Sequence, residues 1–283
     1  ASTDYIFGGQ GGDIIRGGLR GDTLHGHGGD DRFEAVGAAE LSGDRIDGGA
    51  GIDTLALSGG VTFAFAADTM VGVERVLLGS AGGAGYSSYN LTLHNANVAA
   101  GQTLTVDGSG LLRGETMMVY GSGESDGRFV LLGGANNDYL HGGAGNDRIQ
   151  GGLGRDQLRG NGGADTFAYA SAADSTGTGF DQLVGFDWRE DRIDLPGAVS
   201  GWNGSASGTL SAASFNADLA AAADAALQGN GALLFTANAG NYAGRAFLVV
   251  DGNGDGAYTA GQDYVLELVN PAAPLPGTAE FFI

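Results

Sequence analysis

Residues 133–168 read GGANNDYLH, GGAGNDRIQ, GGLGRDQLR and GNGGADTFA when they are written nine to a group. Each group begins with glycine and carries aspartate at its sixth position and an apolar residue at its eighth. The aspartates are Asp138, Asp147, Asp156 and Asp165. Repeats of fixed period are typical of solenoids, in which each repeat packs only on its neighbours. This stretch therefore predicts a stacked, all-β architecture.

The same period of nine occurs near the start of the chain. Residues 8–34 form three groups, GGQGGDIIR, GGLRGDTLH and GHGGDDRFE, and after a slip of four residues two more groups fill 39–56. Their aspartates occupy the same sixth position, at Asp13, Asp22, Asp31, Asp44 and Asp53. A pattern that holds its register in two separate blocks is not a chance arrangement of glycine and aspartate.

The residue types of each group explain its structure. Glycine permits the positive φ of a tight turn and a close approach of the backbone to an ion, and aspartate supplies a carboxylate. The last three residues form a minimal strand with one inward side chain. Two groups then make one coil of a flattened right-handed solenoid, so that residues 18 apart stack. The expected pairs are Asp13 over Asp31, Asp138 over Asp156 and Asp147 over Asp165, and, across the slip, Asp22 over Asp44 and Asp31 over Asp53.

The groups resemble the RTX repeat, GGxGxDxUx with U apolar. This resemblance implies a parallel β-roll whose stacked turns hold Ca²⁺ between carboxylate and carbonyl oxygens, with about five to eight ions in the chain. The alternative is an ordinary β-protein with Asp-Gly turns, but such turns do not repeat in register.

The middle of the chain, residues 57–132, lacks the aspartate pattern but keeps short apolar segments. Strands are expected at 63–65, 75–78, 90–93, 103–106, 117–120 and 128–132. Taken alternately, the segments give two inward sets: Leu55, Val76, Leu104 and Phe129, and Phe63, Leu91, Met117 and Leu140. Because strands this short need neighbours on both sides, we expect one continuous solenoid with wider, metal-free turns. A separate β-sandwich is the alternative.

One catalytic pattern occurs in this middle part. Residues 123–127, GESDG, fit the GxSxG pattern of serine hydrolases. A helix follows the serine in those enzymes, whereas the apolar run 128–132 predicts a strand here, so Ser125 is not expected to be catalytic. His25 and His27 could chelate a transition metal but are better explained as solvent-facing positions. No HExxH zinc motif is present.

The closing part of the chain, residues 169–283, resembles the segment that ends the β-roll in serralysin-type proteases. Asp181 stands before an apolar strand as in that pattern, and it either completes the last ion site or only caps the roll. Alanine-rich residues 216–228 predict a helix that ends at a glycine. Strands are expected at 232–235 and 245–250.

A second kind of metal loop is expected after these strands. Asp251, Asn253, Asp255 and Gly256 match positions 1, 3, 5 and 6 of an EF-hand loop, but Gln262 occupies position 12. Strands flank the loop instead of helices. It therefore resembles the calcium loops of dockerins and RTX tails, and a polar β-turn without metal is the alternative.

The chain ends in Glu280, Phe281, Phe282 and Ile283. An acidic residue before terminal apolar residues resembles the uncleaved C-terminal signal of type I secretion substrates. The prolines at 271, 274 and 276 disfavour regular structure just before it, so we expect an exposed apolar tip. The alternative is that the tip packs on the C-terminal domain as an edge strand.

The composition limits the possible partners. There are 33 acidic residues against 13 arginines and no lysine, for a net charge of −20, and there is no cysteine. Disulfides and zinc–thiolate sites are therefore excluded, and neither nucleic acid nor an anionic membrane is an expected partner. A hard cation such as Ca²⁺ is favoured. No run of 18 apolar residues exists, so we expect no membrane insertion.

These observations predict an all-β-dominated chain: a parallel β-roll or solenoid in two calcium-binding blocks, 1–56 and 133–168. A metal-poor solenoid stretch, 57–132, joins them, and a mostly β capping and secretion-signal domain with one helix, 169–283, closes the chain. We expect it to stay loose in low cytosolic calcium, to pass through a type I secretion apparatus and to fold outside the cell.

The same reading suggests the place of the chain in a larger molecule. It starts at Ala1 instead of Met, so we expect a secreted, extracellular or cell-surface parent such as a protease, lipase, adhesin or surface-layer protein. A stand-alone surface or matrix protein and a hydrolase with its active site in this chain are the alternatives. Its oligomeric state is not assigned.

Overall fold

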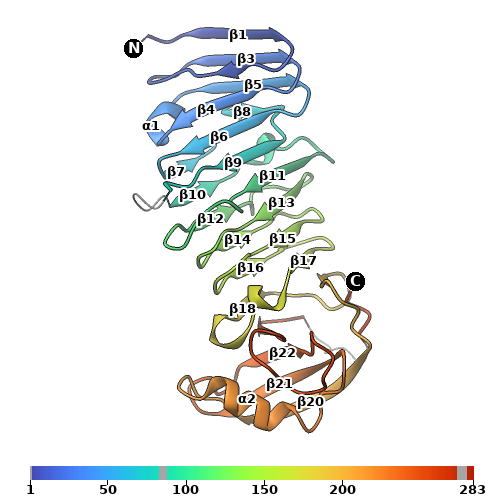
Figure 1. The fold of residues 1–283 in the computed structure, drawn as a ribbon. Helices are drawn as coiled ribbons and strands as arrows, with labels where there is room; N and C mark the ends of the chain where they lie inside the picture. Colours follow the sequence, from blue (N-terminus) through green and yellow to red (C-terminus); the bar gives the residue numbers. More distant parts are fainter. Residues whose placement is uncertain (1, 83–87, 273–278) are drawn as a thin grey trace.

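Strands with one inward side chain stack into two facing parallel layers in the computed structural model, which describes residues 2–82, 88–272 and 279–283. One layer is a nine-stranded sheet that runs the whole length of the stack (Figure 1). Its strands, in spatial order, are β2 (Ile14–Ile15), β4 (Arg32–Val36), β6 (Thr54–Ser58), β9 (Arg75–Leu78), β11 (Thr103–Asp107), β13 (Arg128–Leu132), β15 (Arg148–Gln150), β17 (Thr166–Ala168) and β19 (Arg192–Asp194).

The opposite layer is made of two sheets. A four-stranded parallel sheet covers the first coils, with the order β1 (Tyr5–Gln10), β3 (Thr23–Gly28), β5 (Arg45–Ala50) and β8 (Met70–Val71). A ten-stranded sheet continues the layer with the order β7 (Val61–Ala64), β10 (Tyr89–Thr92), β12 (Met117–Tyr120), β14 (Tyr139–His141), β16 (Gln157–Arg159), β18 (Asp181–Val184), β23 (Tyr264–Val269), β22 (Ala246–Val250), β21 (Gly231–Ala239) and β20 (Gly201–Thr209).

One apolar core fills the space between the layers. Each coil contributes one residue from each face, for example Leu24 from β3 and Phe33 from β4, and both are almost fully buried. Their stacked neighbours Ile46 and Leu55 pair with them in parallel register. Burial of such a side chain stabilises a fold by about 1.5–3 kcal/mol. The predicted parallel solenoid is therefore confirmed.

The slip of four residues between the early groups has a structural cause. It is taken up by α1 (Ala38–Leu41), a single helical turn on the edge of the stack. Leu41 is fully buried, so the inserted turn is anchored in the core. The strands on either side keep their pairing, with β3 against β5 and β4 against β6.

The middle of the chain continues the solenoid, and the alternative of a separate β-sandwich is wrong. β6, β9, β11 and β13 are neighbours in the nine-stranded sheet. Leu55 pairs with Val76 and Leu104 with Phe129, as expected, but Val76 pairs with Val106 instead of Leu104.

The opposite face has a similar shift of two residues. Phe63 pairs with Leu91 as expected, but Leu91 pairs with Val119 instead of Met117. Met117 pairs with Tyr89, and Val119 continues the inward row to Leu140. Both shifts leave the inward face unchanged, because side chains alternate with a period of two.

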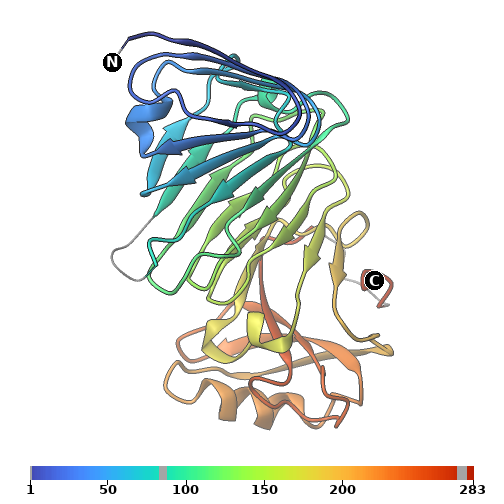
Figure 2. The same ribbon diagram turned by 45° about the horizontal axis from the view of Figure 1, so that its top comes forward.

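A smaller unit closes the C-terminal end of the stack (Figures 1 and 2). β23 pairs in parallel with β18, and β21, β22 and β23 form an antiparallel meander that extends the same sheet. Its own core includes Phe180, Phe215, Leu219 and Phe247. The capping unit is therefore joined to the roll by continuous strand pairing.

Two details of this unit differ from the sequence predictions. The helix α2 (Phe215–Ala223) is shorter than the predicted 216–228, because the chain turns after Ala223 and buries Leu227. β20 was not predicted, since GWNGSASGT has no apolar alternation. Short 3₁₀ turns occur at Asn95–Asn97, Ala172–Asp174 and Gly177–Gly179.

The apolar tip is not exposed as a whole, so that expectation is wrong; the tip packs on the C-terminal part as the alternative expected, but through a single bridge instead of an edge strand. Phe281 is 2 % exposed and packs edge-on against Phe186, Trp188 and Trp202. The tip forms a parallel bridge with β19, and only Ile283 remains exposed, at 62 %. Pro274 and Pro276 lie outside the described residues.

Candidate metal centre

The turns between the strands bring the repeat aspartates into vertical columns. In the first block the backbone N–H of each column member donates to Oδ1 of the aspartate one coil further on, at 2.7–2.8 Å. The expected stacks of Asp13 on Asp31, Asp22 on Asp44 and Asp31 on Asp53 are therefore present. The two columns are Asp4–Asp22–Asp44 and Asp13–Asp31–Asp53, the latter ending at Glu74, whose Oε2 accepts from the Asp53 N–H at 2.8 Å.

The second block has the same arrangement. Asp138 N–H donates to Asp156 and Asp147 N–H donates to Asp165, at 2.8 and 2.9 Å. Each column begins one coil earlier, with the N–H of an apolar residue, and ends on an acid beyond the repeats. The two columns are Met117–Asp138–Asp156–Asp181 and Phe129–Asp147–Asp165–Asp191.

The second oxygen of these carboxylates is the one suited to a cation. Oδ2 is buried and has no hydrogen-bond partner among the described residues in most of the columns. The atoms concerned belong to Asp13, Asp22, Asp31, Asp53, Asp156 and Asp181. Buried polar groups in proteins are normally satisfied, and an unpaired buried carboxylate is costly. Ca²⁺ binds negatively charged carboxylate oxygens of this kind.

The first glycine of a group shows where such an ion fits. A Cβ on Gly8 would lie 2.7 Å from Asp13 Oδ2 and 3.0 Å from the carbonyl oxygen of Gly26 in the next coil. Gly133 likewise faces one carboxylate oxygen, from Asp138, and one carbonyl oxygen, from Gly151. Glycine therefore keeps open a small space toward which a carboxylate and a carbonyl converge.

Burial changes the acidity of these side chains. It raises the pKa of Asp44, Asp138 and Asp147 to about 6, with neighbouring acids adding to the effect at Asp44 and Asp147. Burial and the adjacent aspartates raise the pKa of Asp156 and Asp165 to about 8. The charged form of these carboxylates is thus poorly solvated, and a bound cation would stabilise it.

Side chains alone do not surround an ion here. Within the described parts of the chain, no group of three or more His, Asp or Glu side chains is arranged to hold a metal. Each place offers one or two carboxylates from stacked turns together with backbone carbonyls. A cation with many flexible oxygen ligands, such as Ca²⁺, suits this set better than Zn²⁺.

The predicted site residues fall into two groups. All nine repeat aspartates lie in the columns, and Asp181 ends one of them, where burial raises its pKa well above the usual value. Sequence reasoning missed Asp4, Glu74 and Asp191. Asp4 lies nine residues before Asp13, and all three precede the same strand pattern, in DYI, ERV and DRI. The period of nine could have identified Asp4, and the acid before a short strand could have identified Glu74 and Asp191.

The loop after β22 is organised differently. Asp251 Oδ1 accepts from Gly254 N at 2.7 Å, and its Oδ2 accepts from Gly256 N at 2.8 Å. Asn253 Nδ2 donates to Asp255 Oδ2 at 2.9 Å. The Asp251 carboxylate thus stabilises the loop itself. Metal binding by Asp251, Asn253 and Asp255 stays a prediction.

Comparison with protein families identifies the repeats that form the columns. The model of the RTX calcium-binding nonapeptide repeat, in four copies, matches residues 3–35, 42–60 and 132–167. The chain carries RTX repeats. These RTX repeats bind calcium, and the matched segments contain all the repeat aspartates. No curated protein matches the sequence.

The hydrolase pattern lies in a turn of the solenoid. Ser125 Oγ donates to Asn95 Oδ1 at 2.6 Å, and the strand β13 follows the turn directly. His25 and His27 stack on the exposed ring of Phe7, with ring centres 5.3 and 5.6 Å away.

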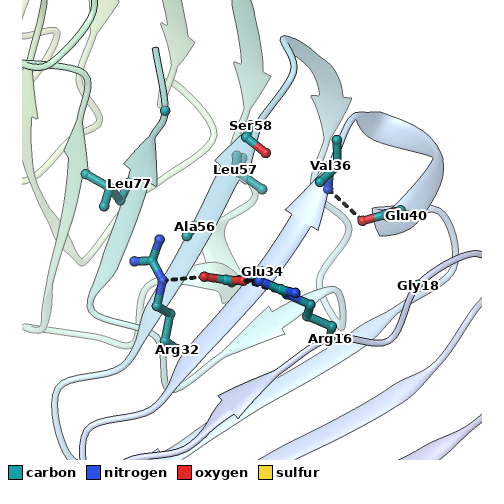
Figure 3. A pocket seen from close by; sticks show the side chains of 11 residues that line it. Arg16, Gly18, Arg32, Glu34, Val36, Glu40, Ala56, Leu57, Ser58 and Leu77 are labelled. Atoms are coloured by element: carbon teal, nitrogen blue, oxygen red, sulfur yellow. Dashed lines mark hydrogen bonds and ion pairs between the residues drawn. The ribbon is translucent and has the colours of Figure 1, made fainter. Parts of the chain in front are cut away.

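A cavity of about 470 Å³ lies on the outer face of β4, β6 and β9, beside α1 (Figure 3). Glu34 lies between Arg16 and Arg32 there, and Glu40 accepts from the Val36 N–H at 2.6 Å. Its acids are thus already paired, and no histidine is among its lining residues.

No helix in the described residues is long and apolar enough to cross a membrane.

Proposed function

We propose that this chain is the calcium-binding, folding and export region of a larger extracellular or cell-surface protein. It passes through a type I secretion apparatus while loose and folds outside the cell when its turns bind Ca²⁺. The observation that carries the proposal is the set of buried Oδ2 atoms without partners, in columns that the backbone already aligns through Oδ1. This role requires no catalytic group.

The residues that would hold the ions are the column aspartates and the carbonyls of the glycine turns. Oδ1 of each aspartate positions the coil above it, and Oδ2 faces the space beside the first glycine. Bound Ca²⁺ supplies the positive charge that allows adjacent carboxylates to be buried together. The stacks accommodate about five to eight ions if each pair of turns holds one.

Calcium titration of the metal-free chain tests the binding part of this proposal. Isothermal calorimetry and equilibrium dialysis should detect several ions per chain at millimolar Ca²⁺, with Mg²⁺ as the control, since Mg²⁺ demands a tighter octahedral geometry and keeps its waters. A chain that binds no calcium at that concentration would refute the proposal.

Export is tested separately. Deletion of the last ten residues should stop secretion from a host with a matched type I exporter, while the repeats still bind calcium. The packing of Phe281 under Trp188 in the folded chain means that an exporter must read the tip before folding. Undiminished secretion of the shortened chain would place the signal elsewhere, with the region 211–229 as the next candidate.

A further inference from the structure

Glu124, in the GESDG turn, is a buried acid outside the RTX repeats. It is only 2 % exposed. Its Oε1 accepts from the backbone N–H groups of Ser125, Asp126 and Gly127 at 3.0, 3.0 and 2.8 Å. Its Oε2 is buried and has no hydrogen-bond partner in the described structure. One oxygen thus shapes the turn, and the other has no partner in the part of the chain that the structure describes.

The turn 121–127 lies directly on the turn 142–147, which belongs to the second group of the second RTX block. Gly121 N donates to His141 O at 2.8 Å, and Ala144 N donates to Glu124 O at 3.0 Å. On the same side, Phe129 N donates to Asp147 Oδ1 at 2.7 Å, which begins the column Phe129–Asp147–Asp165–Asp191. Glu124 therefore lies in the coil just before the first aspartate of this column, in the turn that precedes Phe129.

Gly143 contacts the backbone and side-chain stem of Glu124 as well as the carboxylate of Asp147. A Cβ on Gly143 would lie 2.9 Å from the Cβ and the carbonyl oxygen of Glu124 and 3.3 Å from its Cγ. Gly143 N also donates to Asp147 Oδ2 at 2.7 Å. Both acids therefore reach the same glycine turn. Burial is the main reason why the pKa of Asp147 is raised, and the charge of Glu124 adds to it.

Nothing in the described chain neutralises this pair. None of the ion pairs there involves Glu124 or Asp147. A cation with oxygen ligands satisfies the free oxygen, because it accepts electron pairs from both carboxylates and from carbonyls of the turns.

We propose that Glu124 and Asp147, with turn carbonyls, hold a Ca²⁺ ion at the junction of the 57–132 segment and the second block. The inference rests on the proposed calcium-binding function and extends it to a residue outside the nonapeptide pattern. It gives the GESDG turn a role through its glutamate instead of its serine. The middle segment, expected to be metal-free, then supplies one calcium ligand from its last turn.

Two variants of the same turn provide the test. E124Q removes the charge but keeps an amide oxygen for the three backbone donors, whereas D126N makes the same change two residues away on an exposed side chain. Metal analysis of protein dialysed against saturating Ca²⁺ should find one ion fewer in E124Q than in wild type, and the wild-type number in D126N. An unchanged number in E124Q overturns the proposal.

The stoichiometry separates a ligand from a structural residue, because a variant that only destabilises the fold still carries the full number of ions once saturated. Should E124Q not fold, calcium-grown crystals of the wild-type chain decide the matter through the anomalous scattering of Ca²⁺. A peak bonded to Glu124 Oε2 is expected, and its absence would refute the site. A wild-type chain without any bound calcium would instead refute the proposed function.

Discussion

The two oxygens of each repeat aspartate have different tasks. Oδ1 accepts an N–H from the coil before it, as Asp156 Oδ1 does from Asp138 N at 2.8 Å. Oδ2 of Asp156 is buried without a partner among the described residues. Asparagine can reproduce the first task but not the second, because its Nδ2 is a donor without charge. Substitution by asparagine therefore tests the ion role with the coil geometry preserved.

Asp156→Asn should weaken calcium binding by about tenfold or more for the ion it contacts, the equivalent of about 1.4 kcal/mol or more. Asp126→Asn, which changes an exposed carboxylate outside the columns, should leave the affinity unchanged. Calorimetric titration of both variants measures the difference. Equal affinities in the two would mean that the columns are not the ion sites.

The acidity of the columns predicts a dependence on pH that calcium reverses. The pKa of Asp138 is raised to about 6 and those of Asp156 and Asp165 to about 8, chiefly by burial, against about 3.9 in an unfolded chain. The metal-free fold binds these protons more tightly than the unfolded chain does. Its free energy of unfolding is therefore largest below about pH 4 and falls as the pH rises toward 8.

Circular dichroism of metal-free protein between pH 4.5 and 8 checks this direction. The β signal should decrease with rising pH without calcium. With calcium it should persist, because the ion needs the deprotonated carboxylates and its affinity rises over the same range. A metal-free chain with more β structure at pH 8 than at pH 5 would contradict the expectation.

At the scale of the elements, each turn depends on glycines with a negative φ as much as on those with a positive one. Gly133 has a φ that any residue can adopt, yet a Cβ there would lie 2.7 Å from Asp138 Oδ2 and also against the Gly151 carbonyl oxygen. Gly110 also lacks a positive φ, but a Cβ there would meet nothing within 4 Å.

These two glycines form a matched pair for mutation. Gly133→Ala should lower the calcium affinity of its turn by about tenfold or more, since the methyl group fills the space toward which the oxygens converge. Gly110→Ala should leave calcium binding and stability near the wild-type values. Calorimetry with thermal unfolding distinguishes the two, and equal behaviour would show that the space beside Gly133 holds no ion.

The strands that are marked by the repeat pattern could be predicted from the sequence, and the other elements only in part. Strands after Asp or Glu, such as β15 and β9, are marked by a local triplet. The pairing of Val76 with Val106 instead of Leu104 could not be predicted. A shift of two residues leaves the same side chains inward, so hydrophobic alternation does not distinguish the registers.

The candidate site also has residues that the repeat pattern predicts and residues that it does not. The columns follow from spacing, because parallel stacking places residues 18 apart in contact. Glu124 could not be found in this way, since it belongs to no group of nine, and only its burial and its free oxygen reveal it. The position of Phe281 depends on Trp188 and Trp202, which lie about 80–90 residues earlier in the chain.

The end of the chain is therefore a structural element of the cap. Phe281→Ala should destabilise the folded, calcium-bound protein by about 3–5 kcal/mol, as for other buried phenylalanines. Ile283→Ala, at a side chain that is 62 % exposed, should have little effect. Urea unfolding at saturating calcium measures both, and a neutral Phe281→Ala would mean that the tip is not held against the tryptophans.

At the scale of the whole molecule, the nine-stranded sheet passes through both RTX blocks and the middle segment without interruption. The sheet on the opposite face continues into the capping unit through the pairing of β18 with β23. Arg155, from the last coils, contacts Glu267 of β23 at 3.2 Å and lies over the ring of Phe180. Folding of the roll and of the cap should therefore be coupled.

The metal-free chain should accordingly be largely disordered at neutral pH. Its net charge is −20 with 56 glycines, so self-repulsion and backbone entropy both oppose folding. Buried carboxylates without partners add to this cost in both blocks. Far-UV circular dichroism in EDTA at pH 7.5 should show little β structure, and millimolar Ca²⁺, but not Mg²⁺, should restore it in one cooperative transition. A full β spectrum in EDTA would show that the apolar core alone outweighs the repulsion, and calcium would then bind to a preformed roll instead of driving its folding.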